Sequence, residues 1–106
     1  MENLIHKCER VLKGYYRDTY QGLVWYGSSA RGQADPYSDI DLLVLLNGPV
    51  DYFVELRRIV ELLYPVQLEC DRLISAKPVS TDEYERGSIA LYRIAKREGM
   101  RWDAQS

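Results

Sequence analysis

The feature that most constrains the fold is a pair of short apolar runs separated by a polar loop. The first run, residues 23–26, leads into Gly27 and Ser28, and the second, residues 42–46, follows Asp39-Ile40-Asp41. Each run is aliphatic or aromatic and is bounded by turn-forming residues, which is typical of β-strands. Because side chains alternate along a strand, the two aspartates are expected to project from the same face.

Two carboxylates this close together indicate a site for a divalent cation, because they repel each other and are costly beside an apolar core. Mg²⁺ binds through one or two carboxylates together with water and substrate phosphates. Gly27 and Ser28 offer backbone N–H groups and a hydroxyl, and a helical turn beginning at Ser28 would add positive charge. Arg31 is placed to contact the same phosphates, and Ser38 to steady the loop before Asp39. We therefore predict a metal-dependent site for a nucleoside triphosphate.

The same stretch resembles the signature of a known enzyme superfamily. Gly27-Ser28, ten intervening residues and Asp39-Ile40-Asp41 are similar to the motif of the nucleotidyltransferases related to DNA polymerase beta. The fuller strings, Gly-Ser-x-Ala-Arg-Gly and Ser-Asp-Ile-Asp-Leu-x-Val, resemble the minimal nucleotidyltransferase (MNT) group and its MntA-type antitoxins. The resemblance implies a polymerase-beta-type palm, with Mg²⁺ as cofactor and ATP as substrate.

The resemblance also implies a partner. MNT proteins often pair with an α-helical HEPN-domain toxin and are thought to transfer AMP from ATP to a tyrosine of that toxin, which would make this chain a protein adenylyltransferase and an antitoxin. A second interpretation is a catalytically weak or inactive MNT-fold module that neutralises its partner by forming a complex. A third, an enzyme of the aminoglycoside-modifying kind, is disfavoured because no segment resembles a substrate-binding half.

The place of a third carboxylate depends on how the chain folds after its second helix. In one interpretation a strand starts at Val66, and Asp71 or Glu69 faces the site. In the other, a helix continues through Cys70 and a strand runs over residues 72–79, so that Ser75 faces the metals and the third carboxylate is missing. Related enzymes carry a carboxylate on this strand, and the spacing suits Asp71 better than Glu69. We therefore assign Asp71, with Asp39 and Asp41, as a catalytic and metal-binding residue.

The remaining elements complete an α+β pattern. Apolar spacing predicts helices over residues 2–16, 51–63 and 84–97 and a short edge strand over 100–102, with Phe53, Leu56, Ile59, Val60 and Leu63 on the buried face of the second helix. Pro65 is expected to end that helix, and Asp35-Pro36 to form a turn. The order α, β, β, α, β, α predicts a small mixed sheet with helices mainly on one face, as one domain over residues 1–106.

Charge and cysteine content limit the kinds of molecule that the chain is expected to bind and the compartment in which it is expected to work. A net charge of −2 and a pI near 5.4 leave no basic footprint for duplex nucleic acid. Cys8 and Cys70 have no metal-site spacing, and we expect two reduced thiols in a cytoplasmic protein. The first ten residues are unlike a signal peptide, and no apolar run approaches the length of a membrane span. The sequence does not separate partner binding from self-association into a homo-oligomer.

Overall fold

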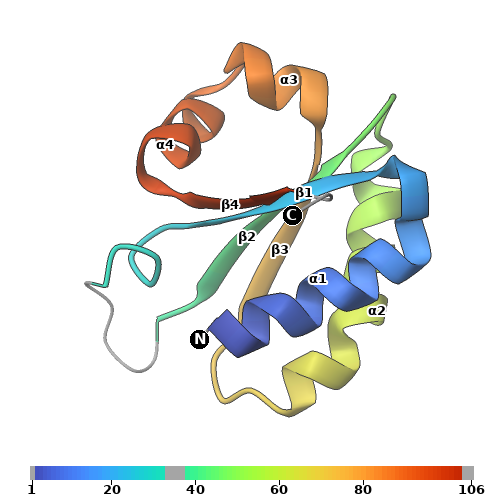
Figure 1. Ribbon diagram of the computed structural model, residues 1–106, viewed down its shortest axis with the longest axis vertical. Coiled ribbons are helices and arrows are strands. Elements are labelled where there is room, and N and C mark those ends of the chain that lie inside the picture. The colour runs from blue at the N-terminus through green and yellow to red at the C-terminus, as the bar shows by residue number, and fades with distance from the viewer. Residues whose placement is uncertain (1, 33–37, 104–106) are drawn as a thin grey trace.

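A computed structural model describes residues 2–32 and 38–103 (Figure 1). The predicted turn at Asp35-Pro36 lies outside these residues. The chain forms, in order, α1 (Glu2–Tyr16), η1 (Arg17–Thr19), β1 (Tyr20–Tyr26), β2 (Ile40–Leu46), α2 (Tyr52–Leu68), β3 (Ile74–Ser80), α3 (Thr81–Arg86), α4 (Ala90–Glu98) and β4 (Met100–Asp103). Among the described residues, no helix combines the length and the apolar character needed to cross a membrane.

The strands of the described residues form a mixed four-stranded sheet in the order β3-β2-β1-β4. Strand β1 is antiparallel to both β2 and β4, whereas β2 and β3 are parallel and are connected through α2. Every residue of β2 except Asp41 is buried. The continuous apolar run over residues 42–46 therefore occupies a central strand that is covered on both faces, as the sequence predicts.

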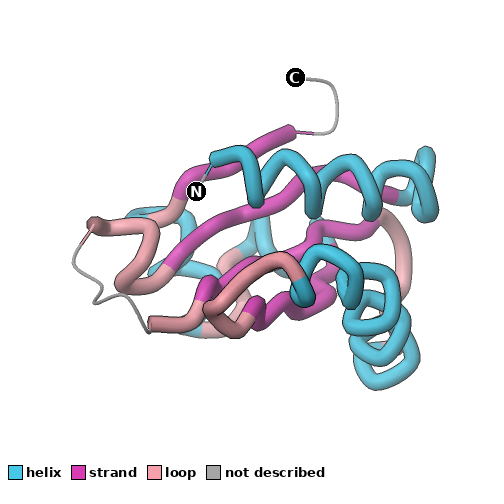
Figure 2. The backbone as a smooth tube through the Cα atoms, turned by 90° about the horizontal axis from the view of Figure 1, so that it is seen from below, coloured by secondary structure: helices cyan, strands magenta, loops and turns pink. Residues whose placement is uncertain are grey.

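Side-chain alternation divides the core into two layers. Leu42 and Val44 of β2 pack on the side of the sheet that carries α1 and α2. Leu43 and Leu45 pack on the opposite side with Tyr84 of α3, alongside α4. The two longer helices thus cover one face and the two shorter helices cover the other (Figures 1 and 2), whereas helices mainly on one face were expected. This arrangement is the expected α+β fold and is consistent with a polymerase-beta-like nucleotidyltransferase palm.

Helix α2 is longer than predicted. It begins after Asp51, whose carboxylate accepts a hydrogen bond from the Val54 N–H, and it continues through Pro65 to Leu68. A proline inside a helix removes one backbone hydrogen bond. However, the buried residues Ile59, Leu63 and Val66 keep helical spacing across the proline. Packing of this face against the sheet therefore outweighs the lost hydrogen bond, and the prediction that Pro65 ends the helix is wrong.

The last predicted helix is two helices. Gly87 adopts a left-handed conformation with φ 61°, and its N–H and that of Ser88 donate to the carbonyls of Tyr84 and Glu83. These bonds are typical of a helix C-terminus. The chain then re-enters a helix at Ala90, and the predicted edge strand at the end of the chain is confirmed as β4, paired with β1.

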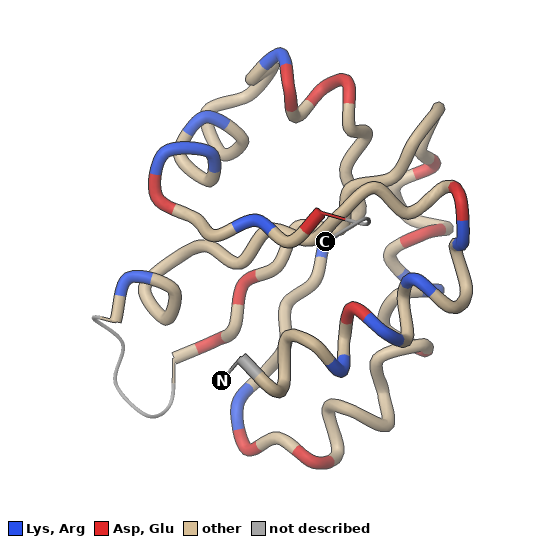
Figure 3. The backbone as a smooth tube through the Cα atoms, viewed as in Figure 1, with Lys and Arg blue, Asp and Glu red and all other residues tan. Residues whose placement is uncertain are grey.

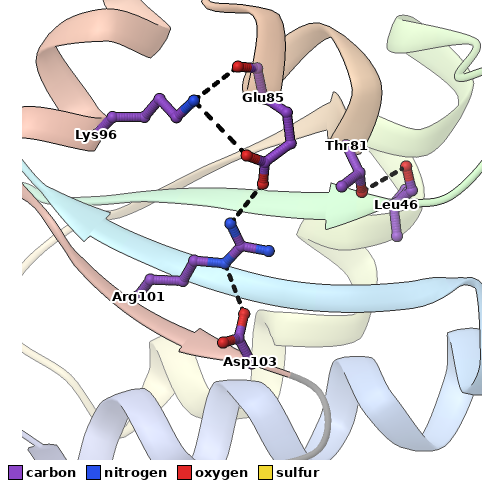
Figure 4. Close-up of polar contacts among 6 residues, drawn as sticks. All are labelled: Leu46, Thr81, Glu85, Lys96, Arg101 and Asp103. Carbon is purple, nitrogen blue, oxygen red and sulfur yellow. Dashed lines mark hydrogen bonds and ion pairs between the residues drawn. The ribbon is translucent and has the colours of Figure 1, made fainter.

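Polar contacts fasten α3 and α4 to β4 (Figure 4). The Glu85 carboxylate accepts a hydrogen bond of 2.6 Å from Arg101 and lies 3.6 Å from the Lys96 ammonium. The hydrogen bond from Arg101 lowers the pKa of Glu85, and Arg101 also pairs with Asp103 at 2.6 Å. Nearby, the Thr81 hydroxyl donates to the Leu46 carbonyl at 3.2 Å. Over the described chain as a whole, acidic and basic residues are interspersed (Figure 3).

Candidate active site

The two halves of the sequence motif meet at one end of the two central strands, where β1 ends and β2 begins. Strands β1 and β2 are antiparallel and pair Tyr26 with Asp41, so that Gly27 emerges beside the start of β2. A Cβ built on Gly27 would lie 2.5 Å from Oδ2 of Asp41. Gly27 also has φ 84°, a conformation that side chains disfavour. Only glycine therefore allows the carboxylate to lie directly against the loop backbone.

A single helical turn follows Gly27. The Arg31 N–H donates to the Gly27 carbonyl at 3.3 Å, and the Gly32 N–H donates to the Ser29 carbonyl at 3.4 Å. The Ser29 hydroxyl is buried and accepts a hydrogen bond of 2.9 Å from Nε1 of Trp25, itself a core residue. The core thus holds the turn in place through Trp25. Sequence reasoning missed this bond, whose only sequence signal is a hydroxyl four residues after an indole in an apolar run.

The two aspartates differ in exposure. Asp39 precedes β2 and is exposed, whereas Asp41 is half-buried within the strand. Asp41 and Leu43 are two residues apart on β2 and therefore point to the same face of the sheet. This is the face that carries α3 and α4. Burial raises the pKa of the Asp41 carboxyl, the charge of Lys77 opposes that shift, and the charge of Asp39 adds to it. Lys77, on β3, is a residue near the site that sequence reasoning missed.

The predicted third carboxylate is not on the neighbouring strand. Strand β3 begins at Ile74 rather than Val66, and its parallel register places Ser75 opposite Asp41. Asp71 lies in the exposed connection between α2 and β3. The prediction of a strand that presents Asp71 to the site is therefore wrong, and the alternative with Ser75 at that position describes the structure.

Local hydrogen bonds explain why the chain turns where it does. The Gln67 side chain donates to the Arg72 carbonyl at 2.8 Å and accepts from the Ile74 N–H at 2.8 Å, which closes the connection into β3. Glu69, the other candidate, points to α1 and pairs with Lys7 at 3.1 Å. Glu69 is thus engaged away from the site.

In residues 2–32 and 38–103, no group of three or more His, Cys, Asp or Glu side chains could hold a metal ion. The carboxylate pair of Asp39 and Asp41 nevertheless fits Mg²⁺, which takes one or two protein carboxylates and completes its shell with water and phosphate oxygens. Asp35, another acidic residue of the loop, lies outside the described residues.

The other two predicted site residues flank the carboxylates. Arg31 is exposed and pairs with Glu98, at the end of α4, at 2.9 Å. The Ser38 carbonyl accepts a hydrogen bond of 2.9 Å from Nε of Arg72, which fixes the backbone directly before Asp39. The structure therefore brings Gly27, Ser28, Ser38 and the two aspartates to one edge of the sheet, with Arg31 one turn away.

A family profile described as nucleotidyltransferase domain matches residues 7–95, a range that includes both halves of the motif and β3. None of the curated proteins matches the chain in sequence.

Proposed function

The chain belongs to the nucleotidyltransferase domain family, and we propose that within this family it is an adenylyltransferase antitoxin of the MNT type. In this proposal, AMP passes from ATP to a tyrosine of a HEPN-domain toxin in the cytoplasm. The observation that carries the enzymatic part is the carboxylate of Asp41 lying against the Gly27 loop, two residues after Asp39. The antitoxin part is supported by the resemblance of residues 27–44 to the MNT signature.

Asp39 and Asp41 are the residues that would hold Mg²⁺. The raised pKa of Asp41 results from burial and from the neighbouring charge of Asp39, and a bound cation would offset both costs. When bound, Mg²⁺ would neutralise charge on the triphosphate and on the departing pyrophosphate.

The loop residues bind and orient the triphosphate. We assign the β- and γ-phosphates to the backbone N–H groups after Gly27 and to the Ser28 hydroxyl. The bond from Trp25 to Ser29 holds this turn in place before substrate arrives, which lowers the cost of ordering the site. Arg31 would exchange its exposed pair with Glu98, worth about 1 kcal/mol or less, for phosphate oxygens.

A tyrosine acceptor suits a site with two carboxylates. The phenol gives up its proton to solvent, its oxygen forms a bond to the α-phosphorus of ATP, the bond from that phosphorus to the bridging oxygen breaks, and pyrophosphate leaves. A phenol has a pKa of about 10 and is far more acidic than water or an alcohol, so it needs less help from a base or a second cation to lose its proton. The residue opposite Asp41 is Ser75 rather than a carboxylate. The missing third carboxylate therefore reduces the reaction rate less when the acceptor is a tyrosine than when it is a sugar hydroxyl.

Ser75 also favours the second candidate function, a catalytically weak or inactive module that neutralises its partner by complex formation. A carboxylate at this position would give the site a third ligand, and its absence leaves Asp39 and Asp41 alone among the described residues to hold metal. Such a site can bind nucleotide without turning it over at a useful rate.

The test uses the chain co-expressed and purified with the protein encoded beside it. The complex is incubated with Mg²⁺ and with ATP labelled on the α-phosphate, and label and intact mass are followed on both chains. We expect AMP on the neighbour, lost in the Asp39→Ala/Asp41→Ala variant and retained in the control Asp71→Ala, whose exposed side chain lies in the connection before β3 and not on a strand of the site. A stable complex without label on either chain would select the binding module.

A further inference from the structure

The outward face of α2 carries several exposed apolar side chains. The helix buries Ile59, Leu63 and Val66 toward the sheet. On the opposite face lies what we call the α2 stripe, whose four side chains are 57% to 79% exposed: Phe53, Val60, Tyr64 and Leu68. They are spaced seven, four and four residues apart, which places them in one line on a helix. Single exposed apolar residues are ordinary, but four of them aligned on one helix face mark an interaction surface.

Two charged residues interrupt the α2 stripe. Arg57 lies toward its N-terminal end, and Glu61 lies one turn further on. Within the described part of the chain, neither side chain takes part in an ion pair. The N-terminal half of the stripe thus carries a positive charge, and a negative charge follows it one turn later.

We propose that the α2 stripe is the interface of a two-fold symmetric homodimer in which the α2 helices of two copies pack antiparallel. In such a dimer the same surface of each copy meets itself, and the N-terminal half of one stripe meets the C-terminal half of the other. Arg57 of each copy then faces Glu61 of the other. In the same register, Tyr64 of each copy lies against Val54 of the other, next to Phe53.

The order of the two charges makes this face of α2 complementary to the same face of a second copy in antiparallel orientation. A parallel pairing would set Arg57 against Arg57 and Glu61 against Glu61, whereas the antiparallel pairing sets opposite charges against each other twice. Helix α2 packs on the face of the sheet that carries Leu42, and Asp41 lies on the other face. The dimer therefore leaves both candidate active sites open, and the inference does not rest on the proposed function.

The first test is the mass of the intact chain in solution, by size-exclusion chromatography with light scattering. We expect about twice the chain mass of 12.3 kDa. Val60→Asp should give a monomer, because it buries a carboxylate between the helices. The matched control Ile89→Asp, at an aliphatic residue that is 49% exposed and outside α2, should remain dimeric. A monomeric wild-type chain would overturn the proposal. If Val60→Asp then weakened binding to the protein encoded beside it, the α2 stripe would be the interface with that protein instead, and the homodimer would still be refuted.

The second test is a charge exchange. Arg57→Glu and Glu61→Arg should each weaken the homodimer by about tenfold or more, because each places like charges opposite each other at two symmetric positions. An equimolar mixture of the two variants should restore a dimer, since every facing pair then has opposite signs. Far-UV circular dichroism verifies that each variant is folded. Equal dimerisation of the variants alone and mixed would overturn the antiparallel pairing.

Discussion

Replacing Gly27 by alanine tests whether close approach of the loop backbone to Asp41 builds the site. Gly27 has φ 84°, and a side chain in the left-handed region costs about 1–2 kcal/mol. The new Cβ would lie 2.5 Å from Oδ2 and 3.3 Å from Cγ of Asp41. Real Cβ atoms do not come that close to other atoms, so the carboxylate must move away from the loop. Gly27→Ala should therefore lose both stability and the geometry of the metal–phosphate site.

Gly48 supplies a matched control. It also has φ 84°, but a Cβ there would meet no heavy atom within 4 Å. Gly48→Ala should carry the same backbone cost of about 1–2 kcal/mol without disturbing Asp41. The difference between the two variants isolates the contact from the conformational strain.

Urea denaturation measures the first effect, and titration calorimetry of ATP in the presence of Mg²⁺ measures the second. Both variants should lose about 1–2 kcal/mol of unfolding free energy, and Gly27→Ala at least as much as Gly48→Ala. Only Gly27→Ala should weaken ATP binding, by about tenfold or more, the equivalent of one lost contact of about 1.4 kcal/mol. Wild-type affinity in Gly27→Ala, or an equal loss in Gly48→Ala, would refute the reasoning.

Three further substitutions test the structure. Burial and the charge of Asp39 raise the pKa of the Asp41 carboxyl above its unfolded value of about 3.8. The stability gained by protonating this carboxyl is therefore complete below about pH 3.8 and is lost as pH rises through the raised folded pKa. Asp41→Asn should thus increase the ligand-free Tm at neutral pH, and a gain that persists in acid would contradict this. Trp25→Phe removes the donor to the buried Ser29 hydroxyl and should cost about 1–3 kcal/mol in urea denaturation and weaken ATP binding; unchanged binding would argue against a positioning role. Pro65→Ala restores an N–H within α2 and should stabilise the fold by up to about 3 kcal/mol, whereas a lower Tm would show that the helix needs the proline.

Local pattern predicted the parts of the fold that local forces decide. The apolar run over residues 42–46 specifies a strand buried on both faces wherever its partners lie. The spacing of Asp39 and Asp41 predicts a carboxylate pair at the start of this strand, and the glycine before the loop allows the close approach of Asp41. These inferences need no knowledge of distant contacts, and the central part of the site could therefore be predicted from the sequence.

The third-carboxylate position depended on contacts that the sequence does not display. Residues after Ile59 fit helical spacing through Leu63 and Val66, and also a strand beginning at Val66. Packing of α2 on the sheet and the Gln67 hydrogen bonds that close the turn into β3 stabilise the helix rather than the strand. Packing overrode the ordinary effect of Pro65 on a helix in the same way.

Other differences have comparable causes. Gly87 looks like a mild defect within a long helix, but its left-handed conformation ends α3 and allows α4 to turn over the sheet. Phe53 and Val60 fit the apolar periodicity of α2 and were predicted to be buried, yet they are 79% and 59% exposed. Periodicity reports that a helix has apolar residues, and it does not distinguish the face that packs on the sheet from a face that is open to a partner.

The most direct test of the central claim is where a divalent cation binds in the presence of nucleotide. Mn²⁺ substituted for Mg²⁺ broadens nearby amide signals in NMR spectra, so a titration with Mn²⁺ and ATP maps the site residue by residue. We predict broadening centred on Gly27, Ser28, Asp39 and Asp41, and its loss in the Asp39→Ala/Asp41→Ala variant. Broadening centred instead on the connection around Asp71, or unchanged in that variant, would contradict the account.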